Sequence, residues 1–190
     1  MGPHFDSAGI FLIQTLFGLY ILALMLRFLL QWVRADFYNP LVQALVKITN
    51  PPLVPLRRFI PGLYGLDMAA VVLMLLLKSI ELLLVLNMLG QPVSVLGVVL
   101  MACVELLDLV VMVVFWTVII RVVMSWLNPD PRQPVTRLIV QLTEPVMRPA
   151  RRLIPPLSGL DLSPIAVLIM LQLIRILLVM PLLDVSRSLL

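Results

Sequence analysis

A tandem duplication constrains this chain more than any other feature of its sequence. Sixteen of the 41 residues from Arg27 to Asp67 recur without a gap, at a constant offset of 94, between Arg121 and Asp161. A fixed period indicates that one structural unit is present twice, so we expect two equivalent repeats, residues 1–90 and 91–190. The repeated residues include Trp32 and Trp126, Asp36 and Asp130, Pro40 and Pro134, Thr49 and Thr143, Arg57-Arg58 and Arg151-Arg152, and the triplets Gly65-Leu66-Asp67 and Gly159-Leu160-Asp161.

The large apolar content predicts a membrane protein. Mean hydropathy is +1.11, with 62% hydrophobic and only 13% charged residues, which is too little polar sequence to cover a soluble domain of 190 residues. The apolar runs are continuous and Leu-rich, which favours helices over barrel strands. Each run approaches the 20 or so residues that cross the hydrocarbon layer. We predict an all-α membrane protein with four transmembrane helices, two per repeat, at about residues 10–30, 68–89, 96–120 and 162–183.

The sequence offers little for catalysis. His4 is the only histidine and Cys103 the only cysteine. We found no phosphate-binding loop, nucleophile elbow or metal-ligand spacing. We therefore expect a protein that is not an enzyme, with no catalytic, cofactor or metal site. The net charge of +4 is explained by where the basic residues lie, so we expect no nucleic-acid partner.

Charge placement predicts the orientation of the chain. The segments 31–66 and 121–161 carry most of the basic residues, whereas the link between the second and third runs, residues 87–97, carries no charge. By the positive-inside rule both basic loops are cytoplasmic and both termini lie outside. The repeats then share one orientation and are related by a pseudo-two-fold axis along the membrane normal. Trp32 and Trp126 fall where aromatic residues mark the membrane surface.

Each loop contains an amphipathic segment, at about residues 40–60 and 134–154. Apolar residues such as Leu41, Leu45 and Ile48 recur at helical spacing. Such a helix either lies in the headgroup layer or packs on the loops of its own bundle. Pro51 and Pro145 are expected to interrupt it, with a second short helix or turn beginning there.

The repeated charged residues have alternative interpretations. The pairs Arg57-Arg58 and Arg151-Arg152 either bind lipid phosphates or an acidic partner, or serve only to set topology. Asp67 and Asp161 precede a spanning helix and are expected to cap it. A compatible alternative is that they form ion pairs with Arg27 and Arg121. The candidate lipid or partner contacts are therefore Arg27, Trp32, Arg57, Arg58, Asp67, Arg121, Trp126, Arg151, Arg152 and Asp161.

Five ionisable residues lie inside apolar sequence and are expected to face the bundle interior. We expect Lys78 to pair with Glu81, three residues away on the same helical face. Arg175 then pairs with Asp108, and Glu105 has no formal partner. Glu105 and Asp108 either form a cation or proton site, or belong to a structural ionic lock. The lock is our leading interpretation, because charges that have partners need not move anything. The predicted layer comprises Lys78, Glu81, Glu105, Asp108 and Arg175.

The duplicated motif resembles that of the YggT family of small integral membrane proteins. The resemblance rests on Arg-x4-Trp, then Thr-x-Pro-x3-Pro-x-Arg-Arg-x-Ile-Pro, then Gly-Leu-Asp before an apolar helix, in two copies over nearly the whole chain. It implies residence in a bacterial inner membrane or a plastid thylakoid, one or two copies of the domain, and no known enzymatic activity. Relatives are linked to osmotic-shock tolerance and potassium homeostasis, to cell division or nucleoid distribution, and to cytochrome complex assembly.

Two functions follow as hypotheses. The leading one is a non-enzymatic inner-membrane scaffold or assembly factor that acts through its basic amphipathic cytoplasmic segments. Its expected partners are anionic membrane lipids and a membrane protein or a second copy of the chain. The alternative is an ion-handling protein, for potassium homeostasis or transport, that supports resistance to osmotic stress through the intramembrane acidic residues.

Overall fold

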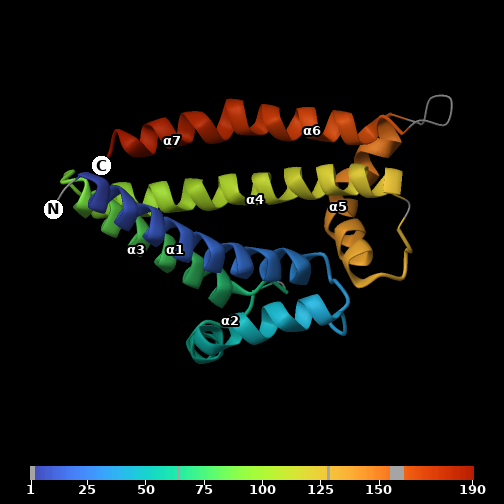
Figure 1. Ribbon diagram of the computed structural model, residues 1–190, viewed down its shortest axis with the longest axis horizontal. Helices are drawn as coiled ribbons and strands as arrows, with labels where there is room; N and C mark the ends of the chain where they lie inside the picture. Colours follow the sequence, from blue (N-terminus) through green and yellow to red (C-terminus); the bar gives the residue numbers. More distant parts are fainter. Residues whose placement is uncertain (1–2, 64, 128, 155–160) are drawn as a thin grey trace.

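The computed structural model describes residues 3–63, 65–127, 129–154 and 161–190, and these residues are almost entirely helical. The long helices run side by side, and the two chain termini lie at the same end of the molecule (Figure 1). We call this the terminal end, and the opposite end, with α2, α5 and their connections, the loop end. In chain order the elements are α1 (Pro3–Trp32), α2 (Pro40–Phe59), α3 (Met68–Met88), α4 (Val95–Leu127), α5 (Pro134–Leu153), α6 (Ser163–Ile174), the π-helical turn η1 (Arg175–Val179) and α7 (Met180–Arg187).

Four helical segments are long and apolar enough to cross a membrane. They are His4–Trp32, Met68–Met88, Val95–Leu127 and Ser163–Arg187, the last being α6, η1 and α7 together. The prediction of an all-α protein with four transmembrane helices is confirmed, and the chain is a multi-pass membrane protein. At 1.5 Å per residue, α1 and α4, with 30 and 33 residues, exceed the roughly 30 Å hydrocarbon layer. These two helices must therefore tilt in the membrane, or their ends must project beyond the hydrocarbon layer.

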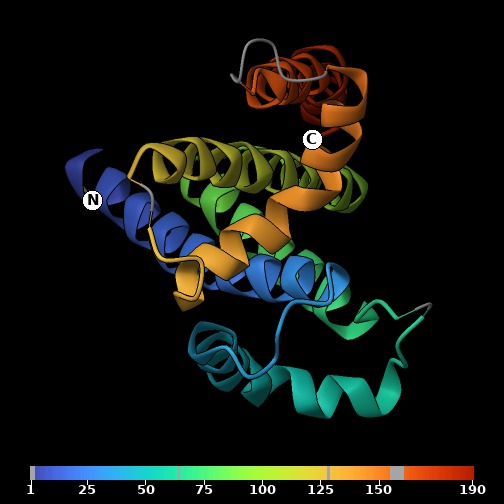
Figure 2. The ribbon, with the colours of Figure 1, turned by 90° about the vertical axis from the view of Figure 1, so that its right-hand side faces the viewer.

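Helices α2 and α5 each begin at a proline, which is favourable because the first helical position needs no N–H bond. The side chain of Asn39 caps α2 by accepting a hydrogen bond from the N–H of Leu41 at 3.0 Å. The expected interruption at Pro51 and Pro145 is wrong, because each helix continues through its internal prolines. The missing hydrogen bond bends the helix instead of ending it. The change of direction in α2 is visible in Figures 1 and 2.

In each repeat the helix of the long connection, α2 or α5, packs against the spanning helices of the same repeat. Leu53 of α2 and Met147 of α5 occupy positions that differ by the repeat offset of 94. Both are completely buried. Leu53 packs with residues of α1 and α3 such as Leu24 and Ala70, and Met147 packs in a second cluster with Val118 and others. The same residue position thus anchors both helices.

At the loop end, the two repeats meet largely through residues at equivalent positions. An apolar cavity of about 410 Å³ lies between α1, α2, α4 and α5. Ten of its twelve lining residues form pairs at the offset of 94, such as Leu45 with Ile139. A hydrogen bond also joins the two repeats, because the side-chain amide of Asn39 donates to the carbonyl of Pro134 at 2.8 Å.

The expected two-fold relation does not extend through the whole bundle. α3 packs against α4, and the equivalent pair would be α6 to α7 against α1. Within the described residues α1 makes no close contact with α6, η1 or α7. The last span packs on α4, and α6 also contacts α5, so α4 is the central helix of the molecule (Figures 1 and 2).

We predict that Leu53→Ala destabilises the protein by about 2–5 kcal/mol, because a fully buried leucine leaves a cavity when it is truncated. Met147→Ala should have a similar effect in the second repeat. Equilibrium unfolding in mixed detergent micelles measures the change. Leu177→Ala is the control, because Leu177 is 72% exposed on the last span. A loss for Leu53→Ala no larger than that for Leu177→Ala would contradict the packing.

Candidate functional site

The repeated motif gathers into one polar cluster per repeat at the loop end. In the first-repeat cluster, Arg27 of α1 donates from Nη1 to the Thr49 hydroxyl of α2 at 2.6 Å. The same atom reaches the carbonyl of Val46 at 3.4 Å. The Thr49 hydroxyl donates in turn to the carbonyl of Leu45, one helical turn earlier. Arg27 and Thr49 are both buried, so this contact ties α2 to α1 inside the protein.

Asp67 completes the first-repeat cluster and has two tasks. Its carboxylate accepts a hydrogen bond from the N–H of Ala70 at 3.4 Å, which caps α3. It also forms an ion pair with Arg57 of α2 through Oδ2 and Nη2, with Nε 3.4 Å from Oδ1. The aspartate therefore pairs with Arg57. The alternative expectation, an ion pair between Asp67 and Arg27, is wrong. Because its side chain is only 5% exposed, this pair is shielded from solvent more than an ordinary surface ion pair.

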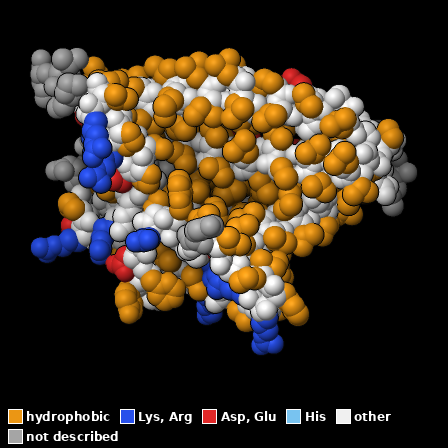
Figure 3. Space-filling view, turned by 180° about the vertical axis from the view of Figure 1, so that it is seen from behind, with side chains coloured by type: hydrophobic (Ala, Val, Ile, Leu, Met, Phe, Trp, Pro, Cys, Tyr) orange, Lys and Arg blue, Asp and Glu red, His pale blue; other side chains and the backbone are white. Residues whose placement is uncertain are grey.

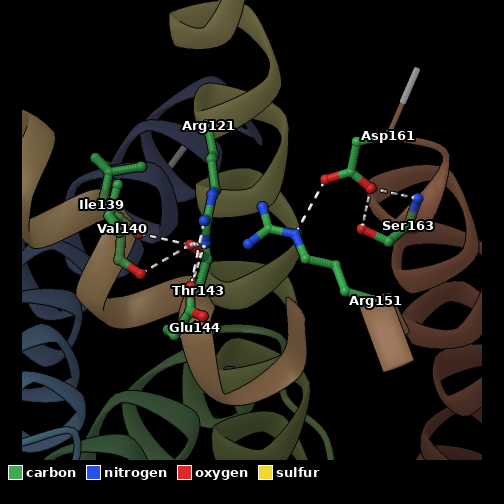
Figure 4. A network of polar contacts seen from close by, with 8 residues as sticks. All are labelled: Arg121, Ile139, Val140, Thr143, Glu144, Arg151, Asp161 and Ser163. Atoms are coloured by element: carbon green, nitrogen blue, oxygen red, sulfur yellow. Dashed lines mark hydrogen bonds and ion pairs between the residues drawn. The ribbon is translucent and has the colours of Figure 1, made fainter. Parts of the chain in front are cut away.

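The second-repeat cluster has the same arrangement with one addition (Figure 4). Arg121 donates to the Thr143 hydroxyl at 2.7 Å, as Arg27 does to Thr49. It also donates from both Nη1 and Nη2 to Glu144 at 3.2 Å. Arg151 pairs with Asp161 at 3.0 Å, so Asp161 likewise does not pair with Arg121.

Asp161 also holds the start of α6. Its carboxylate accepts hydrogen bonds from the backbone N–H of Ser163, at 3.0 Å, and from the Ser163 hydroxyl. Burial opposes ionisation, but these bonds and the nearby Arg151 guanidinium outweigh it and hold the pKa of Asp161 below its usual value. The carboxylate is therefore ionised at neutral pH, when it can accept both bonds.

The remaining motif residues are exposed, although Trp126 also lines a cavity with Arg121 and Asp161. Trp32 and Trp126 are 58% and 80% exposed, so they are free to lie at a membrane surface. Arg58 and Arg152 are exposed as well. The roles of Thr49 and Thr143 were not predicted, although their recurrence at the repeat offset was a signal. No role was predicted either for the large apolar residues after the arginine pairs, Phe59 and Leu153, which are 85% and 82% exposed.

The structure brings the five intramembrane ionisable residues together on neighbouring helices. Lys78 of α3 contacts Glu81 at 2.8 Å and Glu105 of α4 at 2.7 Å. Arg175 contacts Asp108 through Nε at 2.8 Å and Nη2 at 3.3 Å. The expectation that Glu105 has no partner is wrong, because Lys78 bridges both glutamates. Among the described residues, Glu81 Oε2 is buried without a hydrogen-bond partner.

Arg175 lies at the start of the π-helical turn η1. The N–H of Met180 bonds to the carbonyl of Arg175, five residues earlier, instead of four. Pro181 follows directly and has no N–H to donate. Single π-helical turns of this kind often occur at functional positions in helices.

A cavity of about 400 Å³ adjoins this polar layer. It lies on α4 between the first-repeat helices and the last span, with Gly18 and Lys78 on one side and Arg175 and Arg187 on the other. Glu105 and Asp108 line it from α4. In the part of the chain that the structure describes, no group of three or more His, Cys, Asp or Glu residues is placed to hold a metal ion.

Comparison with known proteins explains the duplication. The sequence model of the CCB3/YggT family matches twice, at residues 7–89 and 100–182. The chain belongs to the CCB3/YggT family. The two matches cover both repeats and so support the tandem arrangement of this family member.

Several bacterial proteins resemble the chain over most of its length. An uncharacterised protein of Pseudomonas aeruginosa is 42% identical over 92% of this chain and 89% of its own. The uncharacterised protein YggT of Escherichia coli K12 is 35% identical over 87% of this chain and 86% of its own. An uncharacterised protein of Vibrio alginolyticus is 40% identical over 85% and 88%. No solved structure matches the chain.

We predict that Lys78→Met destabilises the protein by about 3–5 kcal/mol, because removing one partner of a buried ion pair leaves an uncompensated charge. Here two carboxylates, Glu81 and Glu105, lose their shared cation. Adding Glu81→Gln and Glu105→Gln should restore most of the stability, since the uncompensated charges are then gone. Unfolding in mixed detergent micelles measures both variants. A Lys78→Met protein as stable as the parent would show that the bridge contributes nothing.

Proposed function

We propose that the protein is a non-enzymatic scaffold or assembly factor of a bacterial inner membrane, working through two exposed tips at the ends of α2 and α5. We define the tips as Arg58 with Phe59 and Arg152 with Leu153. The observation that carries the proposal is the exposure of these large apolar residues beside free arginines, at the same position in both repeats. Exposed apolar residues next to basic ones are typical of surfaces that bind membranes or other proteins.

The two arginines of each pair differ in whether they are bound to an acidic side chain, and this difference supports the proposal. Arg57 and Arg151 are held by the aspartates that precede α3 and α6. Arg58 and Arg152 form no ion pair with an acidic side chain in the described part of the chain. One arginine of each pair thus supports the fold, while the other remains available to an anionic headgroup or an acidic partner.

The distribution of side chains also fits this placement. Figure 3 shows a body covered by hydrophobic side chains, with the Lys and Arg side chains gathered toward the loop end. We propose that this end is cytoplasmic and that both termini lie outside, in accordance with the positive-inside rule. Each basic residue near an anionic leaflet then contributes about 1 kcal/mol of attraction. The tips would rest at the inner surface of the membrane, where a partner can contact them.

We predict that Arg58→Gln combined with Arg152→Gln weakens capture of a specific membrane partner about thirty-fold, which corresponds to about 2 kcal/mol for two charges. Crosslinking in membranes followed by affinity purification measures the loss. The control is Arg187→Gln, because Arg187 is exposed at the terminal end. The unfolding stability of the double variant should stay unchanged. Equal recovery of the partner by both variants would refute the role of the tips.

The cavity beside the polar layer favours a second candidate, an ion-handling protein that supports osmotic adaptation. Glu105 and Asp108 line that cavity from the same helix. The five residues of the intramembrane layer are three carboxylates and two cations, so the layer has one excess negative charge, although Arg187, which is paired with Asp184, also lines the cavity. A cation or proton entering the cavity would compensate it. Partnered charges do not require such a ligand, and the scaffold remains our first proposal.

For this second candidate, Glu105→Gln with Asp108→Asn should abolish potassium-dependent growth recovery after an osmotic upshift, because both carboxylates at the cavity are then neutral. Growth of a deletion strain carrying each variant measures the effect. The control is Asp184→Asn, whose side chain is 76% exposed near the C-terminus. Immunoblotting must show equal abundance of the variants. Full recovery by the double variant at normal abundance would remove the layer from the mechanism.

A further inference from the structure

A basic cavity lies beside the first-repeat cluster. Its volume is about 640 Å³, and the described residues that line it include Arg27, Arg34 and Arg57 but only one acidic residue, Asp67. The lining therefore has an excess of two positive charges. Asp67 is already engaged by Arg57 and by the start of α3. Part of the wall is apolar, including Leu30 and Ile60, so the cavity combines the features that a lipid headgroup and its glycerol would need.

Arg34 reaches this cavity from a strained backbone position. Its φ of 53° lies in the left-handed region, and it is the only non-glycine residue of the described chain with a positive φ. The turn that ends α1 is of the Schellman type, with Arg34 N–H bonded to Gln31 O at 3.0 Å and Ala35 N–H to Leu30 O at 2.8 Å. Glycine is the usual residue at this point. A long cationic side chain held there despite strain suggests a functional requirement.

The second repeat has an acidic residue beside its spanning-helix arginine, and the first repeat lacks one at the equivalent position. Arg121 is bound through both terminal nitrogens to the carboxylate of Glu144. The residue that corresponds to Glu144 at the offset of 94 is Asn50, which carries no charge. Asn50 Oδ1 is buried without a hydrogen-bond partner among the described residues. Within the described residues, Arg27 therefore donates only to neutral oxygens, those of Thr49 and Val46, and no carboxylate is hydrogen-bonded to it.

We propose that this cavity is a binding site for a phosphate group, formed by Arg27, Arg34 and Arg57. Guanidinium groups suit this ligand because their planar donors match phosphate oxygens in paired hydrogen bonds. Glu144 supplies the second repeat with an internal anion, so only the first repeat binds a ligand. The site is separate from the exposed tips and does not depend on the scaffold function.

The position of the cavity indicates the source of the phosphate. Arg34 and Gln31 lie at the end of a spanning helix, next to Trp32, and aromatic residues at such helix ends are typical of the membrane surface. An anionic phospholipid such as phosphatidylglycerol presents its phosphate at this level. A soluble phosphate would have to arrive from the aqueous side of the same end. The two sources share one chemistry at the arginines and are separated by experiment.

The test is native mass spectrometry of the purified full chain in detergent, titrated in separate arms with phosphatidylglycerol, phosphatidylcholine and inorganic phosphate. We expect one phosphatidylglycerol per chain that survives collision energies at which other lipids dissociate. Asn50→Glu should weaken its binding at least ten-fold, because the new carboxylate neutralises Arg27. The matched control is Asn87→Glu, which adds the same charge at an exposed position on α3. It should leave binding unchanged.

Two further variants separate binding from folding. Glu144→Gln frees Arg121 beside the 400 Å³ cavity that it lines with Arg151, so a second phosphatidylglycerol should be retained. Arg34→Gly removes one of the three side chains that bind the phosphate and relieves the strain of the left-handed backbone. The affinity for phosphatidylglycerol should therefore fall without loss of unfolding stability. Arg58→Gln with Arg152→Gln should leave the retained lipid in place, which separates this site from the tips.

Retention of phosphatidylglycerol without inorganic phosphate assigns the site to a lipid headgroup, and the reverse assigns it to a soluble phosphate. Either result upholds the site. Absence of both ligands from the parent protein would overturn it. So would equal retention of phosphatidylglycerol by the parent, Asn50→Glu and Arg34→Gly proteins, because the lipid would then be held elsewhere.

Discussion

The contact between a spanning-helix arginine and a threonine of α2 or α5 supports the rest of the structure. Arg27 and Arg121 lie toward the loop ends of α1 and α4, which are long and apolar enough to cross a membrane, and an unpartnered guanidinium inside such a span is costly. Thr49 and Thr143 accept from them at 2.6 and 2.7 Å while donating to carbonyls of their own helices. This contact fixes α2 against α1 and α5 against α4. The apolar anchors, the arginine pairs and the exposed tips all depend on that placement.

Local sequence signals predicted the parts of the fold that depend on local physics. Hydropathy located the four spans, and the offset of 94 located the equivalent residues. The bend at Pro51 was beyond such rules, because burial of Leu53 keeps the helix in place after the proline. Predicting the partners of Glu105 and Asp67 would also have required the distances between helices, which the sequence does not give. Lys78 was assigned to Glu81 because they are close in sequence, whereas the bridge to α4 arises only from packing.

The two repeats share a motif but differ in charge. At the loop end they are nearly equivalent, and each has its Arg–Thr and Arg–Asp contacts. Farther along, α3 packs on α4, whereas the described residues of the last span make no close contact with α1. The exchange of Asn50 for Glu144 leaves Arg27 charged and Arg121 compensated. Duplication thus preserved one framework while allowing each half a different electrostatic character, and equivalent residues need not have equivalent roles.

The π-helical turn at Arg175–Val179 has a geometric consequence for the last span. Accommodating one additional residue in a turn rotates everything that follows by roughly 100° relative to an uninterrupted α-helix. The stripe of side chains on α6 that packs against α4 is therefore not continued in phase by α7. Leu183 and Arg187 line the cavity over α4 because of this phase shift, so η1 decides which part of α7 faces protein and which part faces lipid.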